Sequence, residues 1–258
     1  MSLPLFRGPL RLSLRGGDHD FQGRNKGERN CTSNSEARSI LEDAGIDYCC
    51  GGGKSLQDAC LRANVSAEDI LRQLRLNAER VWPGEEQWTC ASLAQLTRHI
   101  RERHHQYVRG AIPRLRALLA KIREKHGGNH RELGEIEKLF GDVAREMLMH
   151  MQKEEQILFP FIDSLERAAS EGSPVEAPFF QTVRNPIHSM MREHDSAGEL
   201  MRQIRSSSNG YRFPADACTS YQAAYQGLEE FEKDLHLHVH LENNILFPRA
   251  VELEGRAV

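Results

Sequence analysis

The sequence of 258 residues lacks several features that would place it in a familiar class of protein. No apolar run approaches the roughly 18–20 residues that a helix needs to cross a bilayer. Residues 1–14 have no long apolar core, so they make a poor secretory signal. Neither sign of charge dominates, because 34 Lys and Arg residues stand against 37 Asp and Glu residues. We therefore expect a soluble, cytoplasmic protein without an electrostatic footprint for nucleic acid or a membrane.

Cysteine pairs of the common structural kinds are missing as well. The six cysteines are spread along the chain, unlike the framework of a small secreted domain. No pair of CxxC knuckles is present, which argues against a structural zinc ribbon. No segment alternates apolar and polar residues with a period of two, so we predict no sheet.

One stretch of eleven residues occurs twice, at 150–160 and at 238–248, with six identical positions. In each copy a His precedes a Glu by four residues, and Ile-Leu-Phe-Pro follows. Residues at i and i+4 lie on the same face of a helix. Each copy therefore offers an imidazole and a carboxylate side by side, His150 with Glu154 and His238 with Glu242.

Apolar periodicity after residue 91 predicts an antiparallel four-helix bundle over 92–258. The predicted helices span 92–125, 132–169, 186–206 and 216–253. Residues 1–33 lack periodicity and are typical of a flexible extension. Residues 34–80 predict a small helical domain, and 81–91, with Trp82-Pro83-Gly84, predict a linker. The fold class we expect is all-α.

The two His–Glu pairs fall on the second and fourth predicted helices, where they suit a site for two metal ions. Imidazole mixed with carboxylate at the centre of such a bundle favours iron. On the third helix His194 is the best further ligand, since His188 faces elsewhere. On the first, His104 and His105 both border the apolar stripe, and periodicity does not decide between them. His126 is about 30 Å further along, so we expect it at a helix C-terminus instead.

Cys49 and Cys50 are adjacent, and three glycines follow them ahead of a predicted helix. Backbone N–H groups at a helix start lower a thiol pKa and favour the thiolate. A disulfide between adjacent cysteines would be strained and easily reduced. The pair is thus either a redox or metal-transfer site or simply two small buried apolar residues.

Four stretches of this chain, taken together, match a known pattern: 47–52, 150–160, 193–199 and 238–248. With them the chain resembles the di-iron proteins for repair of iron–sulfur centres, which carry a hemerythrin-like bundle. The resemblance covers roughly residues 35–250. The placement of His99-Ile100 and Pro113 relative to His105 favours His105 over His104 as the ligand. His104 departs from the pattern, because an aromatic residue is expected there.

The resemblance implies a cytoplasmic stress protein that helps to restore iron–sulfur clusters damaged by oxidative or nitrosative stress, by supplying iron. Its partners would be damaged iron–sulfur proteins, and Cys49 and Cys50 would work alongside the bundle. We predict two irons, bridged by the two glutamates and bound by four histidines. The metal ligands predicted are His105, His150, Glu154, His194, His238 and Glu242.

Three alternatives stay open. The chain could be a di-iron enzyme that reduces nitric oxide or peroxide, although it does not look like a conventional enzyme. It could be a hemerythrin-like protein that binds or senses oxygen or nitric oxide. It could also be a plain helical protein without metal. The sequence leaves the oligomeric state, a homodimer included, undecided.

Overall fold

The computed structural model describes residues 40, 44, 56–77 and 86–257, and every regular element among them is helical. This confirms the prediction of an all-α protein. The expected extension at 1–33, the Cys49-Cys50 pair and Trp82-Pro83-Gly84 all lie outside the described residues. Residue contacts divide the chain into two compact units, Met1–Ala91 and Ser92–Val258.

In the first unit, helices α2 (Leu56–Ala63) and α3 (Ala67–Asn77) are in contact. Cys60 and Ile70 are buried there. The Asp69 N–H donates to Ser66 Oγ over 3.3 Å, which caps α3 in the way that Ser at an N-cap does. A short helix, α4 (Glu86–Cys90), lies within the segment 81–91 that the sequence analysis assigns to a linker.

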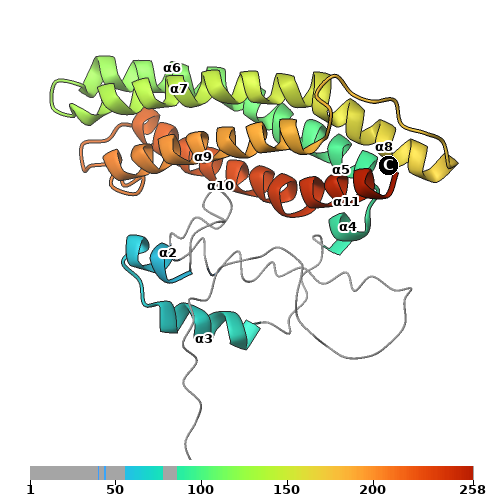
Figure 1. Cartoon of the computed structure of the whole chain (residues 1–258). Helices are drawn as coiled ribbons and strands as arrows, with labels where there is room; N and C mark the ends of the chain where they lie inside the picture. Colours follow the sequence, from blue (N-terminus) through green and yellow to red (C-terminus); the bar gives the residue numbers. More distant parts are fainter. Residues whose placement is uncertain (1–39, 41–43, 45–55, 78–85, 258) are drawn as a thin grey trace, which may run out of the picture. The chain divides into compact units, whose positions relative to one another are not determined.

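The second unit consists of four long helical rods (Figure 1). The first is α5 (Leu93–His99), η1 (Ile100–His105) and α6 (Gln106–His126). The second is α7 (Glu132–Lys153), η2 (Glu154–Leu158) and α8 (Phe159–Glu171). The third is α9 (Arg184–Ser207), and the fourth is α10 (Thr219–His240), η3 (Leu241–Leu246) and α11 (Phe247–Ala257). Here η denotes a π-helical segment.

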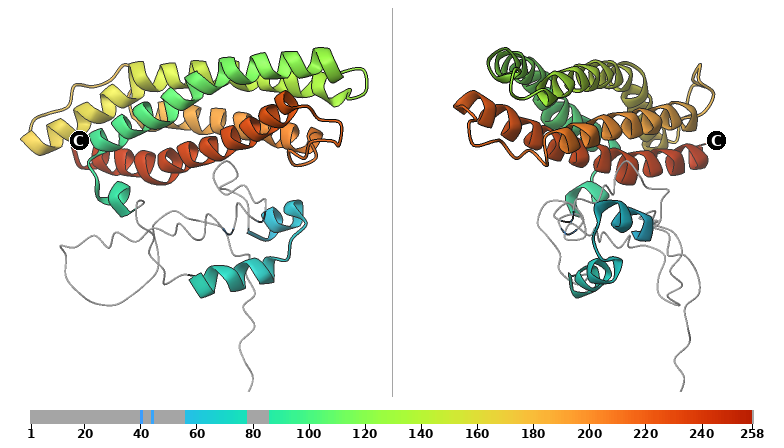
Figure 2. Two further views of the ribbon diagram at one scale, coloured as in Figure 1. Left: turned by 180° about the vertical axis from the view of Figure 1, so that it is seen from behind. Right: turned by 90° about the vertical axis from the view of Figure 1, so that its left-hand side faces the viewer.

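Successive rods run antiparallel, which confirms the predicted bundle. Helix α6 packs against α7 and α10, and α7 packs against α9. Figure 2 shows the α6–α7 pair lying over the α9–α10 pair from behind and from the end. The core between the rods holds six fully buried aromatic side chains. They are Phe140, Phe159, Tyr221, Tyr225, Phe231 and Phe247.

Carboxylates from other rods hold the starts of two helices. Glu166 of α8 accepts the N–H groups of Leu93 and Ala94 at the start of α5. Glu254 of α11 accepts the N–H of Val183 just before α9. A negative charge at a helix N-terminus satisfies unpaired N–H groups and favours the helix dipole. These contacts join the first rod to the second and the third to the fourth at one end of the bundle.

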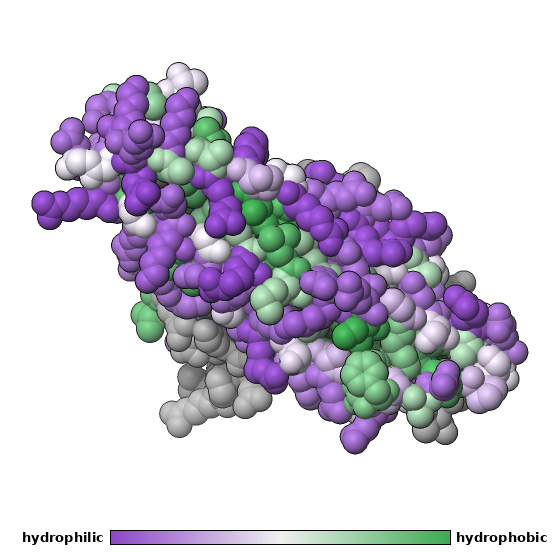
Figure 3. Space-filling model, turned by 90° about the horizontal axis from the view of Figure 1, so that it is seen from above, coloured by the Kyte–Doolittle hydropathy of each residue, from purple (hydrophilic) through white to green (hydrophobic). Residues whose placement is uncertain are grey.

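The surface seen from the α6–α7 side is mostly hydrophilic, with hydrophobic side chains in a broken strip (Figure 3). Leu148 and Met149 of α7 are among the exposed apolar residues. Within the described part of the chain, no helix is both long and apolar enough to cross a membrane.

Candidate metal centre

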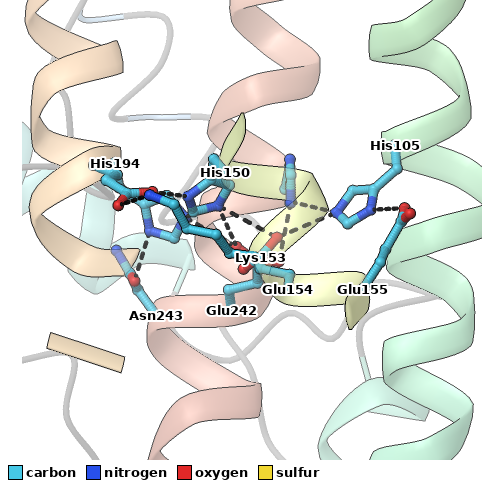
Figure 4. Close-up of polar contacts among 10 residues, drawn as sticks. His105, His150, Lys153, Glu154, Glu155, His194, Glu242 and Asn243 are labelled. Atoms are coloured by element: carbon cyan, nitrogen blue, oxygen red, sulfur yellow. Dashed lines mark hydrogen bonds and ion pairs between the residues drawn. The ribbon is translucent and has the colours of Figure 1, made fainter. Parts of the chain in front are cut away.

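The six side chains that the sequence analysis selects as ligands lie together at the centre of the bundle (Figure 4). All six are at most 1 % exposed. They form two overlapping groups of four, and the ligand atoms of each group lie within 4.8 Å of one another. Both groups contain Glu154 and Glu242. One group adds His105 and His238, and the other adds His150 and His194.

Helical spacing makes the two His–Glu contacts that the duplicated stretch predicts. His150 Nε2 is 3.3 Å from Glu154 Oε2, and His238 Nε2 is 3.0 Å from Glu242 Oε1. Each glutamate lies in a π-helical segment, Glu154 at the start of η2 and Glu242 within η3. His105 is the last residue of η1. Three of the four rods thus change helical register at the level of the centre.

The ring nitrogens that face the centre are close to one another. His105 Nε2 lies 3.3 Å from His238 Nε2, and His150 Nε2 lies 3.0 Å from His194 Nε2. His194 Nε2 is also 3.0 Å from Glu242 Oε2. Two ligands at right angles on one ion, each about 2 Å from it, stand about 3 Å apart. The observed separations fit that arrangement.

The opposite nitrogen of three histidines donates to a fixed acceptor. His105 Nδ1 is 2.7 Å from Glu155 Oε1, and His150 Nδ1 is 3.1 Å from Glu193 Oε2. His194 Nδ1 is 3.0 Å from Asn243 Oδ1. Because each acceptor takes the Nδ1 proton, the neutral ring presents its Nε2 lone pair to the centre. Such outer partners are what orient histidines that bind metals.

The two outer carboxylates are themselves held by cations. Arg109 donates to Glu155 Oε2 over 2.8 Å, and Lys153 donates to Glu193 Oε1 over 2.6 Å. Burial raises the pKa of Glu193, but hydrogen bonds from His150 and Lys153 lower it by more, to about 2. Glu193 is therefore ionised throughout the neutral range and remains an acceptor for the histidine.

The centre itself offers electron pairs and lacks donors to match them. Both carboxylate oxygens of Glu154 are buried without a well-formed hydrogen bond to a described residue, and only the Nε2 atoms of His105 and His150 come within 3.4 Å of Oε2. Two buried carboxylates face one another among imidazole lone pairs, which is unfavourable unless cations are present. This set of donors fits metal ions. Mixed imidazole and carboxylate ligands suit iron, and also manganese or zinc.

The charged groups of the centre also shift one another's pKa values. Burial raises the pKa of Glu242, but the surrounding histidines lower it by more, so that the pKa lies well below its usual value. Burial lowers the pKa of His150, but the carboxylates, Glu154 foremost, raise it well above the usual value. The pKa of His238 is raised by Glu242 against the effect of burial. The centre attracts positive charge in either form.

The structure separates His104 from His105. His105 points into the centre, whereas His104 belongs to neither group of ligands. His104 is buried and lies 3.0 Å, Nδ1 to Oδ1, from Asp234. His126 is also outside the centre, with its Nε2 3.2 Å from Cys218 Sγ at the other end of α10.

The outer partners are what sequence reasoning missed. Glu155 and Asn243 each follow a ligand glutamate by one position, and Glu193 directly precedes His194. These adjacencies were the available signal. They could not be interpreted without knowing which helix faces which, because each partner supports a histidine on a different rod.

Comparison with known proteins adds two domain families and a set of relatives. Residues 96–250 match the hemerythrin HHE cation binding domain, and residues 31–78 match a domain of unknown function, DUF542. The chain is 35 % identical over 220 residues to the "Probable iron-sulfur cluster repair protein" of Haemophilus influenzae. It is 36 % identical over 215 residues to the "Iron-sulfur cluster repair protein YtfE" of Citrobacter koseri and of Escherichia coli O8. Each match covers 83 % of this chain and 91 % of the relative.

Proposed function

The chain belongs to the family of iron–sulfur cluster repair proteins with a hemerythrin-type domain, and we propose that it restores iron–sulfur clusters damaged by oxidative or nitrosative stress. It does so in the cytoplasm by donating iron held at the centre of the bundle to damaged iron–sulfur proteins. The relatives' names support repair as the role. The observation that supports iron as the cargo is the buried centre built only from electron-pair donors.

The proposed centre holds two irons. Each glutamate is shared by both groups of ligands, which is what bridging carboxylates require. Two histidines then complete each iron position, His105 with His238 and His150 with His194. Two bridges and four imidazoles leave coordination positions open for small ligands such as nitric oxide or oxygen.

The outer partners help the histidines to retain the iron. Glu155 and Glu193 hold two of the rings in orientation and make their Nε2 atoms better electron donors. Arg109 and Lys153 restrain these carboxylates from the edge of the centre. Removing such a partner typically costs about 10–100-fold in metal affinity.

Iron content tests the proposed ligands. Glu154→Ala and Glu242→Ala should each lose most of the iron that wild type retains after gel filtration, because each removes a ligand from both positions. His105→Ala should lose more iron than His104→Ala. Iron per chain measured by mass spectrometry decides both points. Full iron content in both glutamate variants, or a greater loss in His104→Ala, would contradict the assignment.

Transfer tests the role itself. Iron-loaded protein is mixed under anaerobic conditions with an iron–sulfur enzyme whose cluster nitric oxide has damaged, together with sulfide and a thiol reductant. Recovery of the cluster's absorption and of the enzyme's activity should follow the iron-loaded protein and not an equal amount of Glu154→Ala. Catalytic consumption of nitric oxide without any iron transfer would instead favour a di-iron enzyme.

The Cys49-Cys50 pair remains a proposed transfer site. Replacing both with Ser should leave folding and iron content nearly unchanged but slow the repair reaction at equal iron loading. The measurement compares repair rates of wild type and the double variant, with circular dichroism as the control for folding. Equal rates would make the pair dispensable. Loss of folding would show that the thiols are part of a core.

A further inference from the structure

His238 differs from the other three histidines at the centre. Its Nε2 faces Glu242 and His105, so the proton of its neutral form is on Nδ1. That Nδ1 is buried, and no described residue accepts its proton. Histidines that bind metals nearly always donate this proton to a carboxylate, a carbonyl or water. His105, His150 and His194 follow the rule directly, whereas His238 does not.

His104 lies beside His238 and has a nitrogen that lacks a hydrogen-bond donor. The two rings are stacked, with centroids 5.7 Å apart and planes 13° from parallel. In its neutral form His104 donates from Nδ1 to Asp234 Oδ1 over 3.0 Å, which leaves a lone pair on Nε2. That Nε2 is buried too, and no described residue donates to it. One ring thus has a proton to donate, and its neighbour has a lone pair to receive one.

We propose that a buried water joins these two rings, accepting from His238 Nδ1 and donating to His104 Nε2, so that Asp234 supports a metal ligand through His104. A buried water needs two to four polar partners, of which His238 Nδ1 and His104 Nε2 would supply two. Tyr107, three residues after His104, has a buried hydroxyl without a described partner. The Oδ2 atom of Asp234 is also buried and has no described partner. The first and fourth rods thus carry four buried polar atoms without a described partner, two on each rod.

The proposal assigns a role to His104, the position at which the family pattern calls for an aromatic residue. His104 is a positioning residue, since it reaches the metal only through the water and His238. The proposed water relay rests on the proposed metal centre, and it makes the two iron positions unequal. At the iron position of His105 and His238, one histidine would reach its carboxylate only through water and His104. At the position of His150 and His194, both histidines donate directly to a side-chain oxygen.

Iron release to a chelator tests the relay. His104→Phe keeps a ring of similar size and removes both nitrogens. It should release one of the two irons about 10–100-fold faster than wild type, the usual effect of losing an outer partner, and leave the other unchanged. Asp234→Asn keeps an oxygen that can accept from His104 and should show a smaller change. The matched control is His126→Phe, because His126 is a half-buried histidine at the end of α6 that contacts Cys218, away from the centre.

Three outcomes decide the matter. Unchanged release of both irons in His104→Phe, with normal circular dichroism, would overturn the proposal. So would a high-resolution crystal structure in which His238 Nδ1 bonds another group. If wild type bound no iron, the proposed function would fail separately. The metal-free crystal would still test the relay, since the water should lie within hydrogen-bond distance of His238 Nδ1 and His104 Nε2.

Discussion

Cys218 and Cys60 are both free thiols, but their environments differ. Cys218 occupies the N-cap position of α10, and His126 Nε2 is 3.2 Å from its sulfur. The hydrogen bond from His126, aided by backbone N–H groups at the helix start, lowers the thiol pKa to about 7. Burial instead raises the pKa of Cys60. The Cys218 thiol is thus about half ionised at pH 7, whereas the Cys60 thiol stays protonated.

We predict that iodoacetamide modifies Cys218 with a rate that rises through about pH 7, because the thiolate is the nucleophile. His126→Gln should move this rise toward the ordinary thiol value of 9.0. Peptide mass spectrometry over a pH series follows each cysteine separately. Cys60 provides the internal control and should stay unmodified in the native protein. A profile for Cys218 that does not change in His126→Gln would contradict the prediction.

At the scale of single residues, spacing was informative where both partners lie on one helix. The i,i+4 relation placed His150 by Glu154 and His238 by Glu242, and the structure brings both pairs together. Spacing could not choose between His104 and His105, which differ by about 100° around a helix. Asp234 was not found for the same kind of reason, because its partner His104 is 130 positions away.

At the scale of elements, the π-helical segments carry the ligands to the centre. Phe159 donates to the Glu154 carbonyl and Phe247 to the Glu242 carbonyl, each five residues back. The next residue is a proline in both cases, Pro160 and Pro248, which has no N–H and cannot restore the α-helical bond. Single π turns occur mostly at functional sites. Here they rotate each glutamate relative to the helix that follows.

The helices could be predicted, but these turns could not. Apolar stripes and the breaks at 127–128, 170–178 and 207–214 predicted four rods, and all four are present. The segments η2 and η3 each precede a proline, which a sequence analysis takes only as a sign of a kink. The segment η1 has no such proline nearby, since Pro113 lies well inside α6. A π turn depends on tertiary packing, so local sequence does not specify it.

Contact between α6 and α10 depends on a glycine. A Cβ added at Gly227 would come within 2.7 Å of Leu115 Cδ2, and Leu115 is fully buried. Overpacking a core usually costs about 1–3 kcal/mol. Alanine gains about 0.5–1 kcal/mol over glycine within a helix, which offsets part of that cost. The close approach of the two helices explains why the better helix former is absent here.

We therefore predict that Gly227→Ala is less stable than Gly110→Ala by about 1–3 kcal/mol. Gly110, within α6, is the matched control because a Cβ there would meet nothing within 4 Å. Urea unfolding of both variants and of wild type gives the free energies. Equal free energies of unfolding for the two variants would show that Leu115 moves aside at no cost.

At the scale of the whole molecule, stability without metal should depend on protons bound at the centre. The folded protein raises the pKa of His150 and His238 above 6.5, so their contribution is full below that pH and is lost as pH rises through the folded values. It lowers the pKa of Glu242 below 4.5, so that contribution is full above 4.5 and is lost in acid. The metal-free centre is therefore most favourable between these values.

With iron bound, stability should no longer fall as pH rises through the histidine pKa values, because iron binds neutral histidines and displaces their protons. We predict that the difference in unfolding temperature between iron(II)-loaded and iron-free protein grows from about pH 5.5 to about pH 8. Anaerobic calorimetry over that range measures it. In the Glu154→Gln, Glu242→Gln double variant, the iron-free protein should lose less stability above pH 6.5, since the carboxylates that raise the histidine pKa values are gone. A difference that stays constant or shrinks with rising pH would mean that iron and protons do not compete for these imidazoles.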